Sequence, residues 1–263
     1  MRNIRMIAVD MDGTFLNRNM EYDRERFWRL FEIMKQRDIK FVVASGNQYY
    51  QLISFFEGRD DEMMFVAENG AYISELGNPL KVTQFSLSEK DSILDFVRDK
   101  PDLINVYCAE SKAYMLINPE RREFVGQWYH RLEEVKDFGC VSEPMIKFNI
   151  NCKDADTQHY LDLIERLLPT SISAVSSGHG SIDLIVSGCH KAFGLNYLAD
   201  RYGITPEEMI VFGDGGNDIE MLKMAKYSYA MENAPAQVKK SAQFLAPSNE
   251  DQGVLTILEQ YLL

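Results

Sequence analysis

Three short apolar runs, each followed at once by a polar residue, constrain the fold of this chain more than any other feature. The runs cover residues 4–9, 40–44 and 63–67, and the first two end at Asp10 and Ser45. The segments between them carry apolar residues at helical spacing. Strands that alternate with helices in this way predict a parallel, doubly wound sheet of the α/β class.

The middle of the chain follows a different pattern. It begins after a hairpin turn at residues 77–79, and the first pattern returns only after Gly188. We expect paired strands among helices here: helices over 88–99, 120–132 and 154–168, and strands near 103–108, 112–117, 145–152, 171–175 and 181–186. The sequence thus predicts a Rossmann-like core domain of residues 1–84 and 187–263, interrupted by an α+β domain of residues 85–186.

Charge and cysteine usage exclude several classes of function. Twenty-eight Lys and Arg against 40 Asp and Glu give a net charge of −12, which disfavours binding to nucleic acid or to an anionic membrane. No run is long and apolar enough for a membrane span, and the first ten residues do not form a signal peptide. The four cysteines form no CxxC pair, so we expect buried thiols in a cytoplasmic protein.

Two acidic strings follow predicted strands. The first is Asp10-Met11-Asp12-Gly13-Thr14, in which the two carboxylates stand two residues apart and can converge on one space. Two carboxylates at such a short distance repel each other, so they need a cation or a proton between them. A strand-end turn with two solvated acids is the alternative.

The second string is Gly213-Asp214-Gly215-Gly216-Asn217-Asp218. Ligand sites of open parallel sheets lie at the carboxyl ends of the strands, and oxygen ligands from several such loops suit Mg²⁺. A glycine-rich turn that caps the following helix, with Asp218 near its positive end, is compatible with this function.

Two weaker signals accompany them. Ser45, Gly46 and Asn47 follow the second strand, where they can cap the next helix or present amides to a phosphate. Lys191 stands at a predicted helix start, where a solvated surface position is the usual case. A nearby anion would explain it, because a cation there opposes the helix dipole.

Taken in order, these motifs resemble those of the haloacid dehalogenase superfamily, and the size and place of the insertion resemble its Cof-type phosphatases of subclass IIB. The resemblance extends over nearly the whole chain and includes residues 68–71. It implies a Mg²⁺-dependent phosphatase that hydrolyses phosphate monoesters of small metabolites through a phospho-aspartyl intermediate. Sugar phosphates are the expected substrates, with cofactor phosphates as further ones.

The resemblance also implies residue roles. Asp10 would be the nucleophile, and Asp12 the acid and then the base. Asp10, Asp214 and the backbone carbonyl of Asp12 would hold Mg²⁺, with Asp218 behind them. The residues that would hold the phosphate are Gly13, Ser45, Gly46, Asn47, Lys191 and Asn217.

The inserted domain would act as a cap that excludes water and reads the rest of the substrate. We nominate His179 and Asp183 as its substrate contacts. A phosphosugar mutase or other phosphotransferase on the same fold, and a non-catalytic phosphometabolite-binding protein, remain alternatives. The expected partner is a small phosphorylated metabolite, and no sequence signal indicates an oligomeric state.

Overall fold

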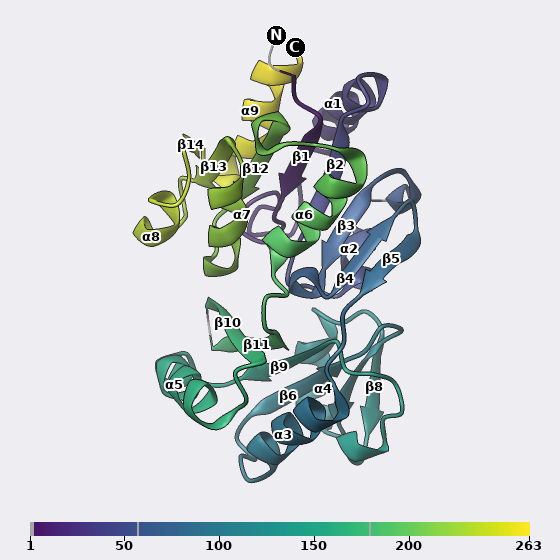
Figure 1. Ribbon diagram of the computed structural model, residues 1–263, viewed down its shortest axis with the longest axis vertical. Helices are drawn as coiled ribbons and strands as arrows, with labels where there is room; N and C mark the ends of the chain where they lie inside the picture. The colour runs from purple at the N-terminus through teal and green to yellow at the C-terminus, as the bar shows by residue number, and fades with distance from the viewer. Residues whose placement is uncertain (1–2, 57, 179) are drawn as a thin grey trace.

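The chain builds two β-sheets, one of eight strands and one of six. The structure is a computed structural model that describes residues 3–56, 58–178 and 180–263. Figure 1 shows the larger sheet with its helices at the top, beside both termini, and the smaller sheet at the bottom. We call the part that builds the larger sheet the core and the part that builds the smaller sheet the cap.

The core sheet has the order β14-β13-β12-β1-β2-β3-β4-β5. Its first six strands run parallel, whereas β4 and β5 are added antiparallel at one edge. The strands are β1 (Met6–Val9), β2 (Lys40–Ala44), β3 (Met64–Ala67), β4 (Tyr72–Glu75), β5 (Asn78–Val82), β12 (Met209–Gly213), β13 (Tyr227–Met231) and β14 (Phe244–Ala246). Because β1 lies between β2 and β12, the chain reverses its winding direction there, which is where ligands bind in such sheets.

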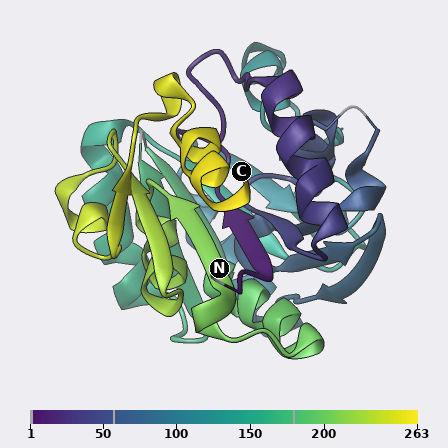
Figure 2. The ribbon, with the colours of Figure 1, turned by 90° about the horizontal axis from the view of Figure 1, so that it is seen from above.

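Helices cover both faces of the core sheet, which confirms the predicted doubly wound α/β fold (Figure 2). Along β1, Ile7 and Val9 point to one face and Met6 and Ala8 to the other. Because both faces are covered by helices, all residues of β1 are buried. One face packs against α1 (Arg24–Gln36), α2 (Tyr49–Ser54) and α9 (Gly253–Leu262), and the other against α6 (Lys191–Tyr202), α7 (Ile219–Met224) and α8 (Ala236–Lys239).

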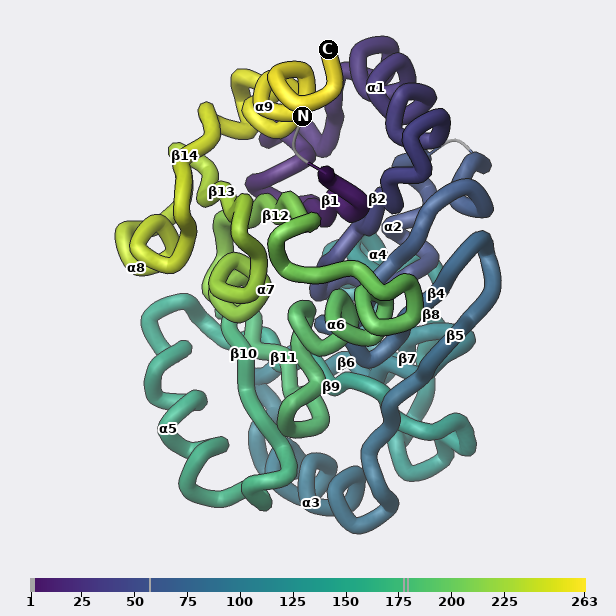
Figure 3. Tube along the Cα trace, turned by 45° about the horizontal axis from the view of Figure 1, so that its top comes forward, coloured from purple at the N-terminus to yellow at the C-terminus, as the bar shows by residue number. Residues whose placement is uncertain are grey.

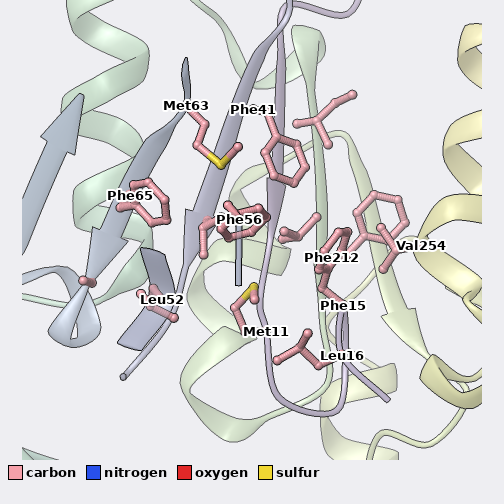
Figure 4. Packing of buried hydrophobic residues seen from close by; sticks show 14 of the residues in the cluster. Met11, Phe15, Leu16, Phe41, Leu52, Phe56, Met63, Phe65, Phe212 and Val254 are labelled. Atoms are coloured by element: carbon pink, nitrogen blue, oxygen red, sulfur yellow. The ribbon is translucent and has the colours of Figure 1, made fainter. Parts of the chain in front are cut away.

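The loop after β1 is anchored in the core by its own apolar residues. Met11, Phe15 and Leu16 are buried in the cluster drawn in Figure 4, and the rings of Phe15 and Phe27 meet edge to face with centroids 5.1 Å apart. Aromatic packing of this kind contributes beyond the area it buries. The polar residues of the loop are therefore carried on a fixed backbone.

The cap sheet has the order β10-β11-β9-β6-β7-β8 and is antiparallel except for the pair β7 and β8. Its elements are α3 (Leu87–Arg98), β6 (Ile104–Cys108), β7 (Ala113–Leu116), α4 (Pro119–Gly126), β8 (Leu132–Val135), β9 (Lys147–Asn151), α5 (Thr157–Leu167), β10 (Ile172–Gly178) and β11 (Ser181–Val186). Single-turn 3-10 helices complete the described chain: Asp60–Glu62, Glu68–Gly70, Phe138–Cys140, Asp154–Asp156, Pro206–Glu208, Gly216–Asp218 and Asn249–Asp251.

The two faces of the central cap strand β9 differ in chemistry. Phe148 and Ile150 of β9 point into an apolar cluster with residues of α3 and α5, whereas Lys147 and Asn149 point the other way, toward the core. The strand β10 lies beside the turn Gly216–Asp218 of the core (Figure 3). The side of β9 that carries Lys147 and Asn149 is thus placed over the carboxyl ends of the core strands.

Several local expectations were wrong. The helix predicted over 120–132 ends at Gly126, and the chain then forms the unpredicted strand β8. The strand β14 was also missed. Of the four cysteines, which are all free, Cys140 is exposed rather than buried. Among the described helices, none has both the length and the apolar character that crossing a membrane requires.

Candidate active site

Asp10 and Asp12 leave the end of β1 in a turn that brings them beside the loop after β12. The backbone N–H of Asp10 donates to the carbonyl of Phe212 over 3.1 Å, which extends the sheet pairing by one residue. Gly13 has φ of +74° and no side chain, and a Cβ atom there would lie 2.4 Å from Oδ2 of Asp214. The glycine therefore lets the two acidic loops approach each other.

A buried lysine joins two of the carboxylates. Nζ of Lys191, the first residue of α6, donates to Oδ1 of Asp10 and to Oδ1 of Asp218, both over 2.6 Å. Lys191 is 1% exposed, so the solvated surface position considered above is ruled out. The other oxygen of Asp218 accepts the backbone N–H groups of Asp214 and Gly215 over 2.9 and 2.8 Å. Asp218 therefore supports the loop and the lysine.

Burial sets the electrostatics of this group. It raises the pKa of Asp10 well above the usual range, repulsion from Asp218 adds to the rise, and Lys191 opposes both. Burial also raises the pKa of Asp214 to about 6, against a hydrogen bond from Thr14 that lowers it. For Lys191 burial acts to lower the pKa, but the two carboxylates outweigh it and the pKa is raised. The site holds more negative charge than its one lysine neutralises.

The donor set fits a divalent cation. One carboxylate oxygen from each of Asp10, Asp214 and Asp218 lies within 4.8 Å of the others. Because both oxygens of Asp218 already accept hydrogen bonds, Oδ2 of Asp10 and Oδ2 of Asp214 are the better placed ligands. Mg²⁺ is commonly bound by one or two carboxylates together with water and a substrate phosphate. A divalent ion here would also supply the missing positive charge.

The predicted phosphate-binding loop lies at the end of β2, next to this group. Ser45 is 1% exposed, and its Oγ accepts the backbone N–H of Asn47 over 3.1 Å. The side chain of Asn47 donates to Oδ2 of Asp12 over 2.6 Å, so the structure commits it to a carboxylate. Asn217 contacts Oδ1 of Asn69 over 3.1 Å rather than Lys191.

The two cap residues that we nominated have different outcomes. Asp183 of β11 faces the core: its Oδ2 accepts the amide of Asn69 over 2.7 Å, and its Oδ1 accepts the amide of Asn149 over 2.8 Å. His179 lies outside the described residues. His190 caps α6, because its Nδ1 accepts the backbone N–H of Phe193 over 3.1 Å.

Sequence reasoning missed a second buried lysine. Lys147 of β9 is 2% exposed, and its Nζ lies 2.7 Å from Oε2 of Glu68 and 3.6 Å from Oδ1 of Asp183. Burial lowers the pKa of Lys147, but these carboxylates outweigh it and raise the pKa well above the usual range. The alternation in residues 147–151, polar against apolar, was the available signal for a strand with one face turned to a polar site.

Comparisons with known proteins agree with this geometry. A family model described as haloacid dehalogenase-like hydrolase matches residues 7–258. The chain is 40% identical over 262 residues to the 5-amino-6-(5-phospho-D-ribitylamino)uracil phosphatase YbjI of Escherichia coli (strain K12), across 99% of this chain and 97% of that protein.

Solved structures also match over nearly the whole chain. SMU.1108c of Streptococcus mutans UA159 superposes with a TM-score of 0.94 at 37% identity, covering 98% of this chain and 99% of that one. A protein described as the HAD subclass IIB sugar phosphatase BT4131 shares the fold, with a TM-score of 0.83 at 18% identity and coverage of 98% of both chains.

Proposed function

This chain belongs to the haloacid dehalogenase-like hydrolases and is a phosphatase, and we propose that it hydrolyses phosphate monoesters of small metabolites with the help of Mg²⁺. The observation that supports the proposal most directly is the meeting of Asp10, Asp214 and Lys191 in one buried site. A carboxylate nucleophile, a cation-binding pair and a fixed positive charge are the groups that phosphoryl transfer needs.

We assign the chemical steps to two aspartates. The oxygen of Asp10 that does not hold the cation attacks phosphorus, and the bond from phosphorus to the ester oxygen breaks as Asp12 gives that oxygen a proton. A water then attacks the phospho-aspartyl group, Asp12 takes up one of its protons, and the bond from phosphorus to Asp10 breaks to release phosphate. Lys191 holds Asp10 in place and places positive charge beside the transferring group.

A bound Mg²⁺ would supply Lewis-acid charge to a phosphoryl oxygen and reduce the repulsion between two anions. Its ligands would be side-chain oxygens of Asp10 and Asp214 and the backbone carbonyl of Asp12. Thr14 orients Asp214, because its hydroxyl donates to Oδ1 of that residue over 2.6 Å. We assign the remaining phosphoryl oxygens to backbone N–H groups of Gly13 and Gly46 and to the hydroxyl of Ser45.

We further propose that residues 85–186 form the cap domain on a core of residues 1–84 and 187–263, and that the cap reads the part of the substrate beyond the phosphate. The relative at 40% identity is named for a phosphorylated ribitylaminouracil. That compound is a primary phosphate ester of a sugar alcohol, which supports sugar-type phosphates as the substrate class and makes it the first candidate. The four free cysteines support a cytoplasmic location.

The test is phosphate release from phosphorylated sugars, sugar alcohols, nucleotides and cofactors, each with Mg²⁺ and with EDTA. We expect turnover with Mg²⁺ only, and its loss in Asp10→Asn. Activity that survives this substitution would refute Asp10 as the nucleophile. Product analysis separates the alternatives: phosphate retained on an isomeric sugar would favour a mutase, and tight binding without turnover would favour a binding protein.

A further inference from the structure

One short loop of the core contacts both the catalytic group and the cap. It comprises Ser45, Gly46, Asn47 and Gln48, between β2 and α2, and we call it the β2–α2 loop. Asn47 holds Asp12, while its two neighbours bind the cap. A change in the seating of the cap is therefore transmitted directly to the residue that contacts Asp12.

The first tie to the cap is made by Lys147. Its Nζ donates to the carbonyl of Gly46 over 2.6 Å and pairs with Glu68 over 2.7 Å. Gly46 and Glu68 belong to two adjacent core loops, so one cap residue clamps both. Removing one member of such a buried pair leaves an uncompensated charge, which is strongly unfavourable. The contact is therefore made in one geometry.

The second tie is made by Gln48, which is buried. Its amide donates to the backbone carbonyl of Arg131 over 3.0 Å and its Oε1 accepts the backbone N–H of the same residue over 2.9 Å. This double contact copies the pairing of neighbouring strands. The guanidinium of Arg131 also stacks 3.6 Å from the centre of the Tyr50 ring. The cap thus contacts the β2–α2 loop at a second point, on the residue that follows Asn47.

Asn47 is held between these two ties. Its carbonyl accepts the backbone N–H of Glu68 over 3.1 Å. The carbonyl of Ser45 accepts the backbone N–H of Asn69 over 3.0 Å. Its side chain fixes Oδ2 of Asp12. The other oxygen, Oδ1 of Asp12, is buried and accepts no hydrogen bond from the described residues. A buried unpaired oxygen is costly, and a substrate oxygen would satisfy it.

We propose that Lys147 and Gln48 are positioning residues that act through Asn47, so that seating of the cap turns Oδ1 of Asp12 toward the ester oxygen. The inference rests on the proposed function, because it takes Asp12 as the group that protonates the leaving oxygen. With the cap detached, the β2–α2 loop loses both ties to the cap and keeps its backbone hydrogen bonds to Glu68 and Asn69 of the core, so Asn47 holds Asp12 less firmly. Efficient leaving-group protonation is thus confined to the closed state.

The test compares two esters that differ in their need for a proton. The leaving group of p-nitrophenyl phosphate departs as an anion, whereas the leaving group of glycerol phosphate must be protonated as it departs. The parameter is kcat/KM, which covers the steps up to departure of the leaving group. The variants are Asn47→Ala, Lys147→Met and Gln48→Met, with Asp12→Asn as the reference. Lys112→Met, at a half-buried cap lysine that pairs with Glu133 of the cap, is the matched control.

We expect kcat/KM for glycerol phosphate to fall by about tenfold to a hundredfold in each positioning variant, since general acid catalysis accelerates such reactions by about 10²–10⁴. The fall in kcat/KM for p-nitrophenyl phosphate should be much smaller. Lys112→Met should leave both values unchanged. Circular dichroism checks folding, and Gln48→Met, which removes no charge, serves if Lys147→Met does not fold.

The outcomes separate the two proposals. If Asp12→Asn shows the leaving-group dependence and the positioning variants lose activity equally on both esters, the inference is overturned and the proposed function stands. If Asp12→Asn itself shows no such dependence, the assignment of Asp12 falls and the inference falls with it.

Discussion

Replacement of Gly13 by alanine tests how closely the two acidic loops must approach. Gly13 has φ of +74°, and its missing Cβ would lie 2.4 Å from Oδ2 and 2.9 Å from Cγ of Asp214. Atoms at such distances overlap, so the carboxylate of Asp214 must rotate away. That rotation breaks its 2.6 Å hydrogen bond with Thr14 and moves it out of the group that we propose binds Mg²⁺.

The loss of stability has two parts. The left-handed backbone costs an alanine roughly 1–2 kcal/mol, and loss of a hydrogen bond to a charged group costs about 1.5–3 kcal/mol. Gly203→Ala separates these parts, because Gly203 ends α6 with φ of +58° and a Cβ there would meet nothing within 4 Å. We therefore expect Gly13→Ala to lower the free energy of unfolding by about 1.5–3 kcal/mol more than Gly203→Ala does.

Urea unfolding in EDTA measures the stability difference, and calorimetric titration measures Mg²⁺ affinity. If displacement of the Asp214 carboxylate costs Mg²⁺ binding a similar free energy, the affinity falls at least about tenfold, since 1.4 kcal/mol is a factor of ten. Gly203→Ala should bind Mg²⁺ like the unaltered protein. Equal unfolding free energies for the two variants, together with unchanged Mg²⁺ affinity in Gly13→Ala, would refute the reasoning.

Three further predictions concern the same site and its support. Lys191→Met should abolish turnover and lower the free energy of unfolding in EDTA by about 3–5 kcal/mol; urea unfolding and phosphate release check this, and a stable, active variant would contradict it. Gly194→Ala should lower the free energy of unfolding by about 1–3 kcal/mol in the same assay, because its Cβ would lie 2.3 Å from Cγ1 of Val66. A gain in stability would contradict this prediction and show that α6 can shift. The raised pKa of Asp214, about 6, means that the folded state binds this proton more tightly than the unfolded chain, so its stabilising effect is present at low pH and is lost as pH rises through about 6. In EDTA the midpoint of thermal unfolding should therefore be higher at pH 5.5 than at pH 7.5, and Asp214→Asn should reduce the difference; an unchanged difference would count against a protonated Asp214.

The core sheet could be predicted because its strands are buried on both faces. Residues 6–9 and 209–213 contain almost no polar side chain, so a short apolar run marks each strand without regard to its neighbours. The edge strands β8 and β14 gave no such signal. The strand β8 carries two glutamates, and Phe244 and Leu245 of the three-residue β14 are exposed. Such strands form because a neighbouring strand offers free backbone groups, which no local pattern records.

The grouping of the acidic residues could also be predicted, since parallel strands deliver their carboxyl ends to one edge of the sheet. The burial of Lys191 could not. Its partner Asp10 is 181 residues away along the chain, and a lysine at a helix start is normally solvated. The conformation of Glu68 and Asn69, with φ of 51° and 54°, was equally hidden, because neither residue requires a left-handed backbone.

Two buried lysines in this chain solve related problems in different ways. Lys191 joins Asp10 and Asp218, two residues of the core, so its ion pairs form once, when the core folds. Lys147 joins a cap strand to Glu68 of the core, so its ion pair forms whenever the cap is seated. A buried ion pair gains little net free energy over its hydrated parts, although its geometry is strict. In the open state that our proposal implies, water can therefore replace the contacts of Lys147 with the core at small cost, while the closed position stays unique.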